Sequence, residues 1–149
     1  MKALPFTPEA YCGLYCGSCP QFLATKRGAL PAGQVECRGC RSGSTAEWCS
    51  ECLLKDCARK KGIEFCHLCA DYPCDSLKGF ASHPDYPYHR EIFGYLDAIK
   101  SRGRDVWLSE MKKRWSCSAC GTEASWWDLS CEKCGSTLNG YQKPRRGGT

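Results

Sequence analysis

The sequence predicts a small, irregular, metal-stabilised protein that is α-rich, with short β-hairpins and a C-terminal zinc ribbon. Three observations lead to this fold class. The 149 residues include 15 cysteines, a density that indicates covalent or metal cross-linking rather than an ordinary hydrophobic core. The C-terminal part contains two CxxCG motifs, and the segment before them has apolar residues at helical spacing.

The cysteines indicate metal sites rather than disulfide bonds. The opening segment MKALPFTPEAY has no apolar run of signal-peptide length, and no stretch approaches the roughly 18 apolar residues of a membrane span. We therefore expect a cytoplasmic protein without a membrane partner. Thiols stay reduced in that compartment, and an odd number of cysteines fits complete disulfide pairing poorly.

The formal net charge of +5 does not by itself indicate a nucleic-acid partner. That count treats every cysteine as a neutral thiol, whereas metal binding requires thiolates. One Zn²⁺ with four thiolates has a net charge of −2, so three such sites would change +5 to −1. We therefore discount the basic composition as a sign of a polyanionic partner.

The most specific motif is the pair CSACG and CEKCG, whose cysteines are Cys117, Cys120, Cys131 and Cys134. In a CxxC turn two thiolates can bind one ion while backbone N–H groups donate to the sulfurs, and the following glycine allows a positive φ. Four thiolates close a tetrahedral site and leave no open position for water. The motif therefore predicts a structural Zn²⁺, which availability favours over iron.

The N-terminal part holds 11 further candidate metal ligands, arranged as three triplets and one pair. They are Cys12, Cys16, Cys19, Cys37, Cys40, Cys49, Cys52, Cys57, Cys66, Cys69 and Cys74. Because 11 is not a multiple of four, two groupings stay open. Two four-cysteine sites leave three thiols over, whereas three sites need a histidine, His67 or His83, to complete the last. We expect at least two zinc sites here, and their ligands can interleave.

The spacing CxxCxxxxC occurs twice in this part, starting at Cys49 and again at Cys66. Internal repetition of this kind suggests two similar metal half-sites. A [4Fe–4S] cluster held by four cysteines is the alternative to zinc. The CxxxCxxC spacing from Cys12 to Cys19 is that of radical S-adenosylmethionine enzymes, but this chain is too short for the (β/α) barrel that those enzymes need.

The distribution of cysteines and apolar residues divides the chain into four segments. Residues 1–85 form a cysteine-rich metal-binding domain, 86–114 a helical connector, 115–138 the zinc ribbon and 139–149 a disordered basic tail. In the connector Ile92, Phe93, Leu96 and Ile99 recur at helical spacing. Gly103 is expected to end this helix before a second one begins.

Two tryptophans, Trp126 and Trp127, lie between the two CxxCG motifs. In so small a domain we expect them to pack over the metal site rather than to stack on nucleic-acid bases. The sequence has no phosphate-binding glycine loop, no GxSxG motif and no HExxH motif. We therefore expect a protein that is not an enzyme.

Several segments together resemble a known family. They are YCGLYCGSCPQFLA, CRGC, CLLKDCARKKGIEFCHLCADYPCDSL and WLSEMKKRWSCSACG followed by CEKCG, from Tyr11 to Gly135. The chain is similar to small cysteine-rich proteins of bacteria and archaea, common in anaerobes, which carry a domain of unknown function to which zinc binding is ascribed. The resemblance implies metal binding and a prokaryotic cytoplasm, and it implies no activity.

These observations predict a non-enzymatic, multi-zinc-binding module that serves as an adaptor for a protein partner. A nucleic-acid partner is less favoured. Two alternatives stay open: an iron–sulfur redox or electron-transfer accessory protein, and a thiol-based metal carrier or sensor that uses surplus cysteines.

Overall fold

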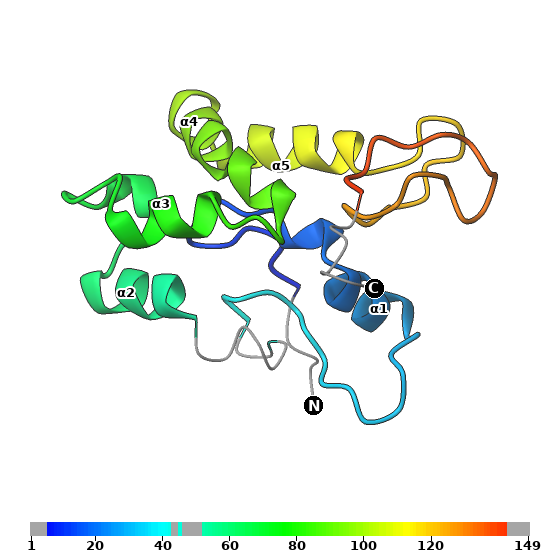
Figure 1. Ribbon diagram of the computed structural model, residues 1–149, viewed down its shortest axis with the longest axis horizontal. Helices are drawn as coiled ribbons and strands as arrows, with labels where there is room; N and C mark the ends of the chain where they lie inside the picture. The colour runs from blue at the N-terminus through cyan, green and yellow to red at the C-terminus, as the bar shows by residue number, and fades with distance from the viewer. Residues whose placement is uncertain (1–5, 43–44, 46–51, 143–149) are drawn as a thin grey trace.

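The computed structural model describes residues 6–42, 45 and 52–142, and in this part the protein is a small, mainly helical molecule (Figure 1). Its helices are η1 (Cys16–Ser18), α1 (Pro20–Arg27), α2 (Leu53–Lys61), η3 (Cys66–Leu68), α3 (Asp75–Ala81), η4 (Pro87–Glu91), α4 (Ile92–Arg102) and α5 (Arg104–Arg114). Figure 1 shows α2 and α3 at one end of the long axis and the loops that follow α5 at the other.

The first three α-helices each begin directly after a cysteine. Cys19, Cys52 and Cys74 are the N-cap residues of α1, α2 and α3, and none of them makes a side-chain capping hydrogen bond. The N–H groups of a first helical turn favour negative charge, so a helix start suits a thiolate. Gly62 ends α2 with φ 67°, and Gly28 ends α1 in the same left-handed conformation.

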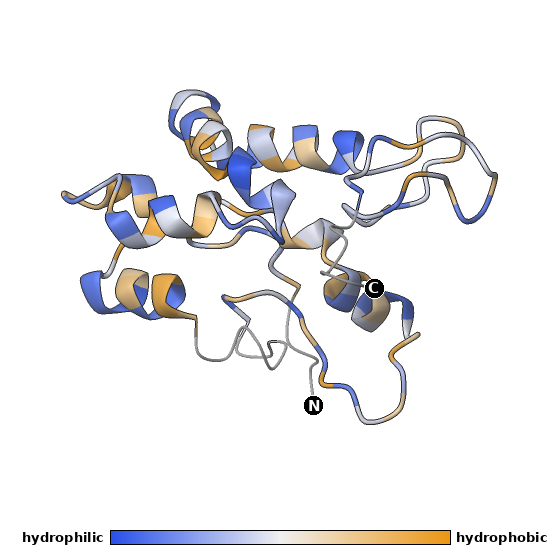
Figure 2. Ribbon diagram, viewed as in Figure 1, coloured by the Kyte–Doolittle hydropathy of each residue, from blue (hydrophilic) through white to orange (hydrophobic). Residues whose placement is uncertain are grey.

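The two predicted connector helices are present as α4 and α5. Gly103 ends α4 with φ 90°, and α5 starts at the next residue. The guanidinium of Arg102 donates to both carboxylate oxygens of Glu110, at 2.7 and 2.9 Å, across the corner between the helices. Figure 2 shows hydrophobic and hydrophilic residues interleaved along both helices, as expected for helices that bury one face.

The core lies beneath α4 and α5, where the N-terminal loop meets them. Ile92, Leu96, Trp107 and Leu77 are fully buried, and Trp107 meets the ring of Tyr15 edge-on at 6.0 Å. The same cluster includes buried Cys12 and is packed by partly buried cysteines. These are Cys16, Cys19, Cys40, Cys52, Cys66 and Cys74. Much of the cysteine-rich part therefore packs on one hydrophobic core together with the connector.

The β-structure is smaller than predicted. In the described residues, strand pairing consists of isolated antiparallel bridges, Glu9 with Tyr15, Ser116 with Glu123 and Ser130 with Thr137. The last two bridges close the two CxxCG turns, where short hairpins were expected. One backbone hydrogen bond lies beyond each of these bridges, from Ala124 to the carbonyl of Trp115 and from Leu138 to that of Leu129.

The C-terminal loops dock on the helices through aromatic side chains. Trp126 is buried and stacks on Tyr88 of η4 at a centroid distance of 3.7 Å, and Trp127 meets the same ring edge-on. The backbone N–H of Trp126 also donates to the carbonyl of Ser18. The expected packing of the tryptophans is therefore present, but against η4 and η1 and not over the four thiols.

Tyr141, which lies in the segment expected to be a tail, contacts the connector. Its hydroxyl hydrogen-bonds the carboxylate of Glu91, which also forms an ion pair with Arg114 at 2.8 Å. Its ring lies 6.2 Å from that of Trp115. These contacts hold residues 139–142 against α5; residues 143–149, with the basic part of the tail, lie outside the described residues.

Across the described residues, no helix combines the length and the apolar content that crossing a lipid bilayer requires.

Candidate metal centre

Four thiols converge in the loops after α5. We name Cys117, Cys120, Cys131 and Cys134 the C-terminal thiol set; all four sulfurs lie within 4.8 Å of one another. The Sγ atoms of Cys117 and Cys134 are 3.5 Å apart, and those of Cys120 and Cys131 are 3.6 Å apart. Four thiolates about 2.3 Å from one tetrahedral ion lie about 3.8 Å apart, so the set has the dimensions of a single-ion site.

The set is built from two turns of the same shape, which follow the sequence pattern SCxxCG with a hydroxyl residue next. In each turn the glycine has φ 77°, and its N–H donates at 2.8 Å to the carbonyl of the first cysteine. The N–H groups of Cys117 and Cys131 donate in turn to the carbonyls of Thr122 and Ser136. Each turn therefore presents two sulfurs on one side, and the two turns face each other.

Hydroxyl groups lie within hydrogen-bond distance of two of the thiols. Thr122 Oγ1 lies 3.1 Å from the sulfur of Cys120, and Ser136 Oγ lies 3.2 Å from that of Cys134. The Thr122 hydroxyl and backbone N–H stabilise the thiolate and lower the pKa of Cys120 to about 6. Ser136 lowers the pKa of Cys134 in the same way. At Cys120 and Cys134 the thiolate, which is the metal-binding form, is thus favoured, whereas burial and the hydrogen bonds with Cys120 and Cys134 raise the pKa of Cys131.

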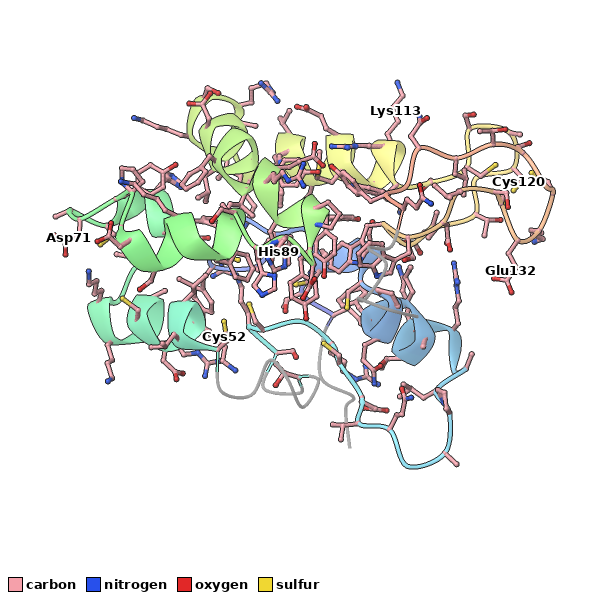
Figure 3. All side chains as sticks on the ribbon, in the orientation of Figure 1. Cys52, Asp71, His89, Lys113, Cys120 and Glu132 are labelled. Atoms are coloured by element: carbon pink, nitrogen blue, oxygen red, sulfur yellow. The ribbon has the colours of Figure 1, made fainter. Side chains whose placement is uncertain are left out.

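Four thiolates at these distances repel one another unless a cation lies between them. Cys117 and Cys131 are buried, whereas Cys120 and Cys134 are exposed. Figure 3 shows Cys120 at the end of the molecule formed by these loops, with Asp71 at the opposite end. The four sulfurs therefore fit one bound metal ion with no open coordination position, and the donor set alone does not identify the metal.

The N-terminal cysteines are not gathered as closely. Within the described part of the chain, the C-terminal thiol set is the one group of three or more ligands whose atoms all lie within 4.8 Å. Cys12 and Cys37 are buried, Cys57 is exposed and the other described cysteines are intermediate. Cys49 lies outside the described residues, and no disulfide bond joins the described cysteines.

Buried thiols from different triplets nevertheless influence one another. Burial raises the pKa of Cys12 well above its ordinary value, and negative charge on Cys40, Cys52 or Cys66 raises it further. Burial also raises the pKa of Cys19, which has Cys37 as its thiol neighbour. The structure thus brings together cysteines that are far apart in sequence, as the interleaved grouping requires.

Cys69 has different surroundings from these buried thiols. The ammonium of Lys61 lies 2.9 Å from its sulfur and 3.1 Å from a carboxylate oxygen of Asp71. The backbone N–H of Asp71 also points at the sulfur, at 3.4 Å. The hydrogen bond from Lys61 lowers the pKa of Cys69, so this thiol ionises more readily than the buried ones.

The two histidines named as candidate ligands differ. His67 lies in η3 between Cys66 and Cys69, and its Nδ1 is buried with no hydrogen-bond partner among the described residues. His83 accepts a hydrogen bond from the N–H of Asp85 at 3.2 Å and lies against Tyr86. Of the two, His67 is the better placed to bind a metal near the N-terminal cysteines.

The comparison with protein-family models concerns the N-terminal part. Residues 8–79 match the model of a family described as a protein of unknown function (DUF3795). This DUF3795 match spans Cys12 to Cys74 and ends before η4, so it leaves out the connector and the C-terminal thiol set, over which the expected resemblance also extended. No curated protein and no solved structure matches the chain.

Thr122 and Ser136 are the site residues that reasoning from the sequence missed. Both follow a CxxCG motif directly, and a serine precedes each motif, so the pattern repeats with a period of 14 residues. That repeat is visible in the sequence. The cysteine spacing alone defines a complete ligand set and does not point to these hydroxyl groups.

Proposed function

We propose that this protein is a non-enzymatic, multi-zinc-binding module that acts as an adaptor for a protein partner. The observation that supports it is the C-terminal thiol set, in which two cross-turn sulfur pairs lie 3.5 and 3.6 Å apart. A closed four-thiolate site binds zinc tightly and offers no position for a substrate or an activated water. Its role is then to hold a surface in shape.

The C-terminal zinc ribbon and the N-terminal zinc sites are part of this proposal. A bound ion ties the two turns together in a segment that has little apolar core of its own, because its buried tryptophan packs outward on η4. Small metal domains commonly obtain their folding free energy in this way. Such a module presents exposed loops in a fixed geometry, and this suits recognition of a partner.

Metal and sulfide analysis of protein purified without oxygen tests the metal assignment. We expect zinc in a ratio above one ion per chain, with no acid-labile sulfide. Cys131→Ser should lower the zinc content by one ion, while the exposed matched variant Ser118→Ala should not. Stoichiometric iron and sulfide would replace the proposal by its alternative, an iron–sulfur electron-transfer accessory protein.

The adaptor role needs a separate test with a partner. A partner protein that binds immobilised wild-type protein should also bind the Ser118→Ala variant. It should not bind Cys131→Ser or the chelator-treated wild type. Equal retention by all four samples would contradict an adaptor whose surface is shaped by metal.

A second candidate function is a thiol-based metal carrier or sensor. The observation that favours it is the hydrogen bond from the Lys61 ammonium to the half-buried thiol of Cys69, at 2.9 Å. A thiolate beside a lysine exchanges metal and reacts with alkylating reagents faster than a buried thiol. Rapid alkylation of Cys69 in the metal-loaded protein would support this function, and full protection of every cysteine would exclude it.

A further inference from the structure

Three segments of the N-terminal part are joined by one arginine. The guanidinium of Arg41 lies between two aromatic rings, 4.1 Å from the centroid of Tyr11 and 4.6 Å from that of Phe65. It also donates to the carbonyls of Glu9, at 2.9 Å, and of Glu64. Cation–π contacts and hydrogen bonds of this kind hold the three segments in a fixed register.

Each of the three stacked residues is the sequence neighbour of a cysteine. Cys12 follows Tyr11, Cys40 precedes Arg41 and Cys66 follows Phe65. The N–H of Cys66 donates to the Tyr11 carbonyl at 2.8 Å, next to Cys12. The stack therefore brings together one cysteine from each of three separate motifs.

A fourth cysteine joins this group from α2. Cys52 is the N-cap of that helix, and Arg59 of the same helix reaches the carbonyl of Cys40 at 3.3 Å and the hydroxyl of Tyr11 at 3.5 Å. Figure 3 shows Cys52 at the start of α2. Both Cys52 and Cys40 pack against the core cluster that contains Cys12.

A second group of cysteines lies on the other side of Cys66. Cys69 closes the turn of η3, since its N–H donates to the carbonyl of Cys66 at 3.1 Å. Lys61 reaches the Cys69 sulfur from α2, and Cys57 lies one helical turn before Lys61 on the same face. Cys74, the N-cap of α3, packs on the same core as Cys66.

Cys66 thus belongs to both groups. We infer that its sulfur bridges two tetrahedral metal ions in one binuclear thiolate centre. Cys12, Cys40 and Cys52 complete the first ion's ligands, and Cys57, Cys69 and Cys74 complete those of the second. The backbone of Cys66 contacts both groups, because its N–H donates to the Tyr11 carbonyl next to Cys12 and its carbonyl accepts from the N–H of Cys69.

The bridge accounts for the number of cysteines. A thiolate sulfur has more than one lone pair and can donate to two ions, so two tetrahedral ions that share one sulfur need seven thiolates. Seven of the 11 N-terminal cysteines are then used. Four are left for one further site, namely Cys16, Cys19, Cys37 and Cys49, the last of which lies outside the described residues.

Positively charged side chains lie among the cysteines of the proposed centre. Binding releases seven thiol protons to solvent, and two divalent ions with seven thiolates keep three net negative charges. Arg41 follows Cys40 in the chain, Arg59 donates to the Cys40 carbonyl at 3.3 Å, and Lys61 contacts the Cys69 sulfur at 2.9 Å. Lys55 is buried, with 7% of its surface exposed, which suits a lysine beside buried negative charge.

The sulfurs of these groups lie further apart than those of the C-terminal thiol set. Rotation about the Cα–Cβ bond moves a cysteine sulfur without moving the backbone, so binding can draw the thiols together. A four-iron cluster would also accept a wide spacing, because each of its thiolates binds a different iron. The test must therefore separate a bridged pair of ions from such a cluster.

The inference rests on the proposed metal-binding function, and ¹¹³Cd NMR of the full-length wild-type protein tests it. Cadmium is a soft, tetrahedral d¹⁰ ion that replaces zinc at thiolates. Two cadmium ions that share the Cys66 sulfur should split each other's resonances, while the ion of the C-terminal thiol set should give an unsplit resonance. If every cadmium resonance were unsplit, the bridge would be excluded while the proposed metal binding would stand. The absence of bound cadmium would overturn both.

Variants provide an independent readout by metal counting. Cys66→Ser should lose two cadmium ions per chain, whereas Cys12→Ser and Cys74→Ser should each lose one. Cys120→Ser, in the C-terminal thiol set, should lose one ion and leave the split resonances unchanged. A loss of one ion from Cys66→Ser would contradict the bridge, as would four irons and four sulfides in protein purified without oxygen.

Discussion

The two cysteine regions of this protein bring their thiols together by different routes. The C-terminal thiol set draws all its ligands from residues 117–134, in two turns of the same shape. The N-terminal cysteines come from segments as far apart in sequence as Cys12 and Cys66, which the stack on Arg41 holds together. Local ligands close short loops and are gathered without help, whereas distant ligands depend on the rest of the fold.

The pKa values of the thiols also differ between the two regions. In the C-terminal thiol set hydroxyl groups lower the pKa of Cys120 and Cys134, which favours their thiolates, while the pKa of Cys131 is raised. In the N-terminal part burial raises the pKa of Cys12 and Cys40, so a metal must displace protons from neutral thiols. We therefore expect the N-terminal ions to bind with the steeper dependence on pH.

The largest difference between the two regions should appear when a buried cysteine of the C-terminal thiol set is removed. Cys131→Ser should abolish metal binding at the C-terminal thiol set and loosen its two turns, because three thiolates cannot close the tetrahedron. Native mass spectrometry should find one ion fewer, with the N-terminal ions retained. Loss of every ion at once would contradict the independence of the two regions.

A glycine in the N-terminal part tests how far that region depends on long-range packing. Gly39 has φ 105°, and a Cβ there would lie 1.9 Å from the carbonyl oxygen of Thr7. Gly39→Ala should therefore lower the free energy of unfolding by about 3 kcal/mol, through backbone strain and the clash.

Gly28→Ala is the matched control, because Gly28 also has a positive φ of 65° but has no atom near its missing Cβ. It should cost about 1 kcal/mol from conformation alone. Denaturant unfolding measures both variants, and equal destabilisation would show that the contact with Thr7 carries no weight.

The hydroxyl groups of the C-terminal turns can be tested singly. Thr122→Val removes the hydroxyl that lies 3.1 Å from the sulfur of Cys120, so it should raise the pKa of that thiol and weaken metal binding about tenfold. Thr137→Val changes an exposed residue beside the opposite turn whose hydroxyl makes no hydrogen bond to a described thiol, so it should leave the affinity unchanged. Competition with a chromogenic chelator measures both, and identical affinities would exclude assistance from Thr122.

A further difference concerns the junction between the regions, at His89. Its Nδ1 donates to the carbonyl of Phe80 at 3.0 Å, and burial lowers its pKa to about 4. The unfolded chain, with an ordinary histidine pKa of about 6.5, binds the proton first on acidification, so the folded state should lose stability between about pH 6.5 and pH 4.

His89→Asn retains a donor for Phe80 but does not titrate, so it should lack this part of the pH dependence. Chemical denaturation at several pH values measures the difference between the two proteins. Parallel curves would show that His89 is not the titrating group.

The sequence was sufficient for those features that depend on neighbouring residues. The CxxCG turns, the helix ends at Gly62 and Gly103 and the amphipathic connector follow from local patterns, and the structure contains all of them. The four thiols of the C-terminal set were also predictable as one group, because their spacing alone closes it. The sequence-derived hairpins there are reduced to single bridges.

Long-range features could not be predicted in this way. The apparent repeat CxxCxxxxC does not correspond to a repeated local structure, since Cys52 begins α2 while its counterpart Cys69 closes the turn of η3. Likewise, Trp126 stacks on Tyr88, which no local pattern pairs with it. Which distant cysteines meet depends on loop closure and on the contacts of Arg41, and spacing carries no information about either.

X-ray absorption at the zinc edge of protein purified without oxygen tests the central claim that thiolates hold zinc. The account predicts a shell of four sulfur atoms at about 2.3 Å around every zinc ion, with no nitrogen or oxygen neighbour. A shell with oxygen or nitrogen ligands, or zinc absent where iron and sulfide are present, would contradict it.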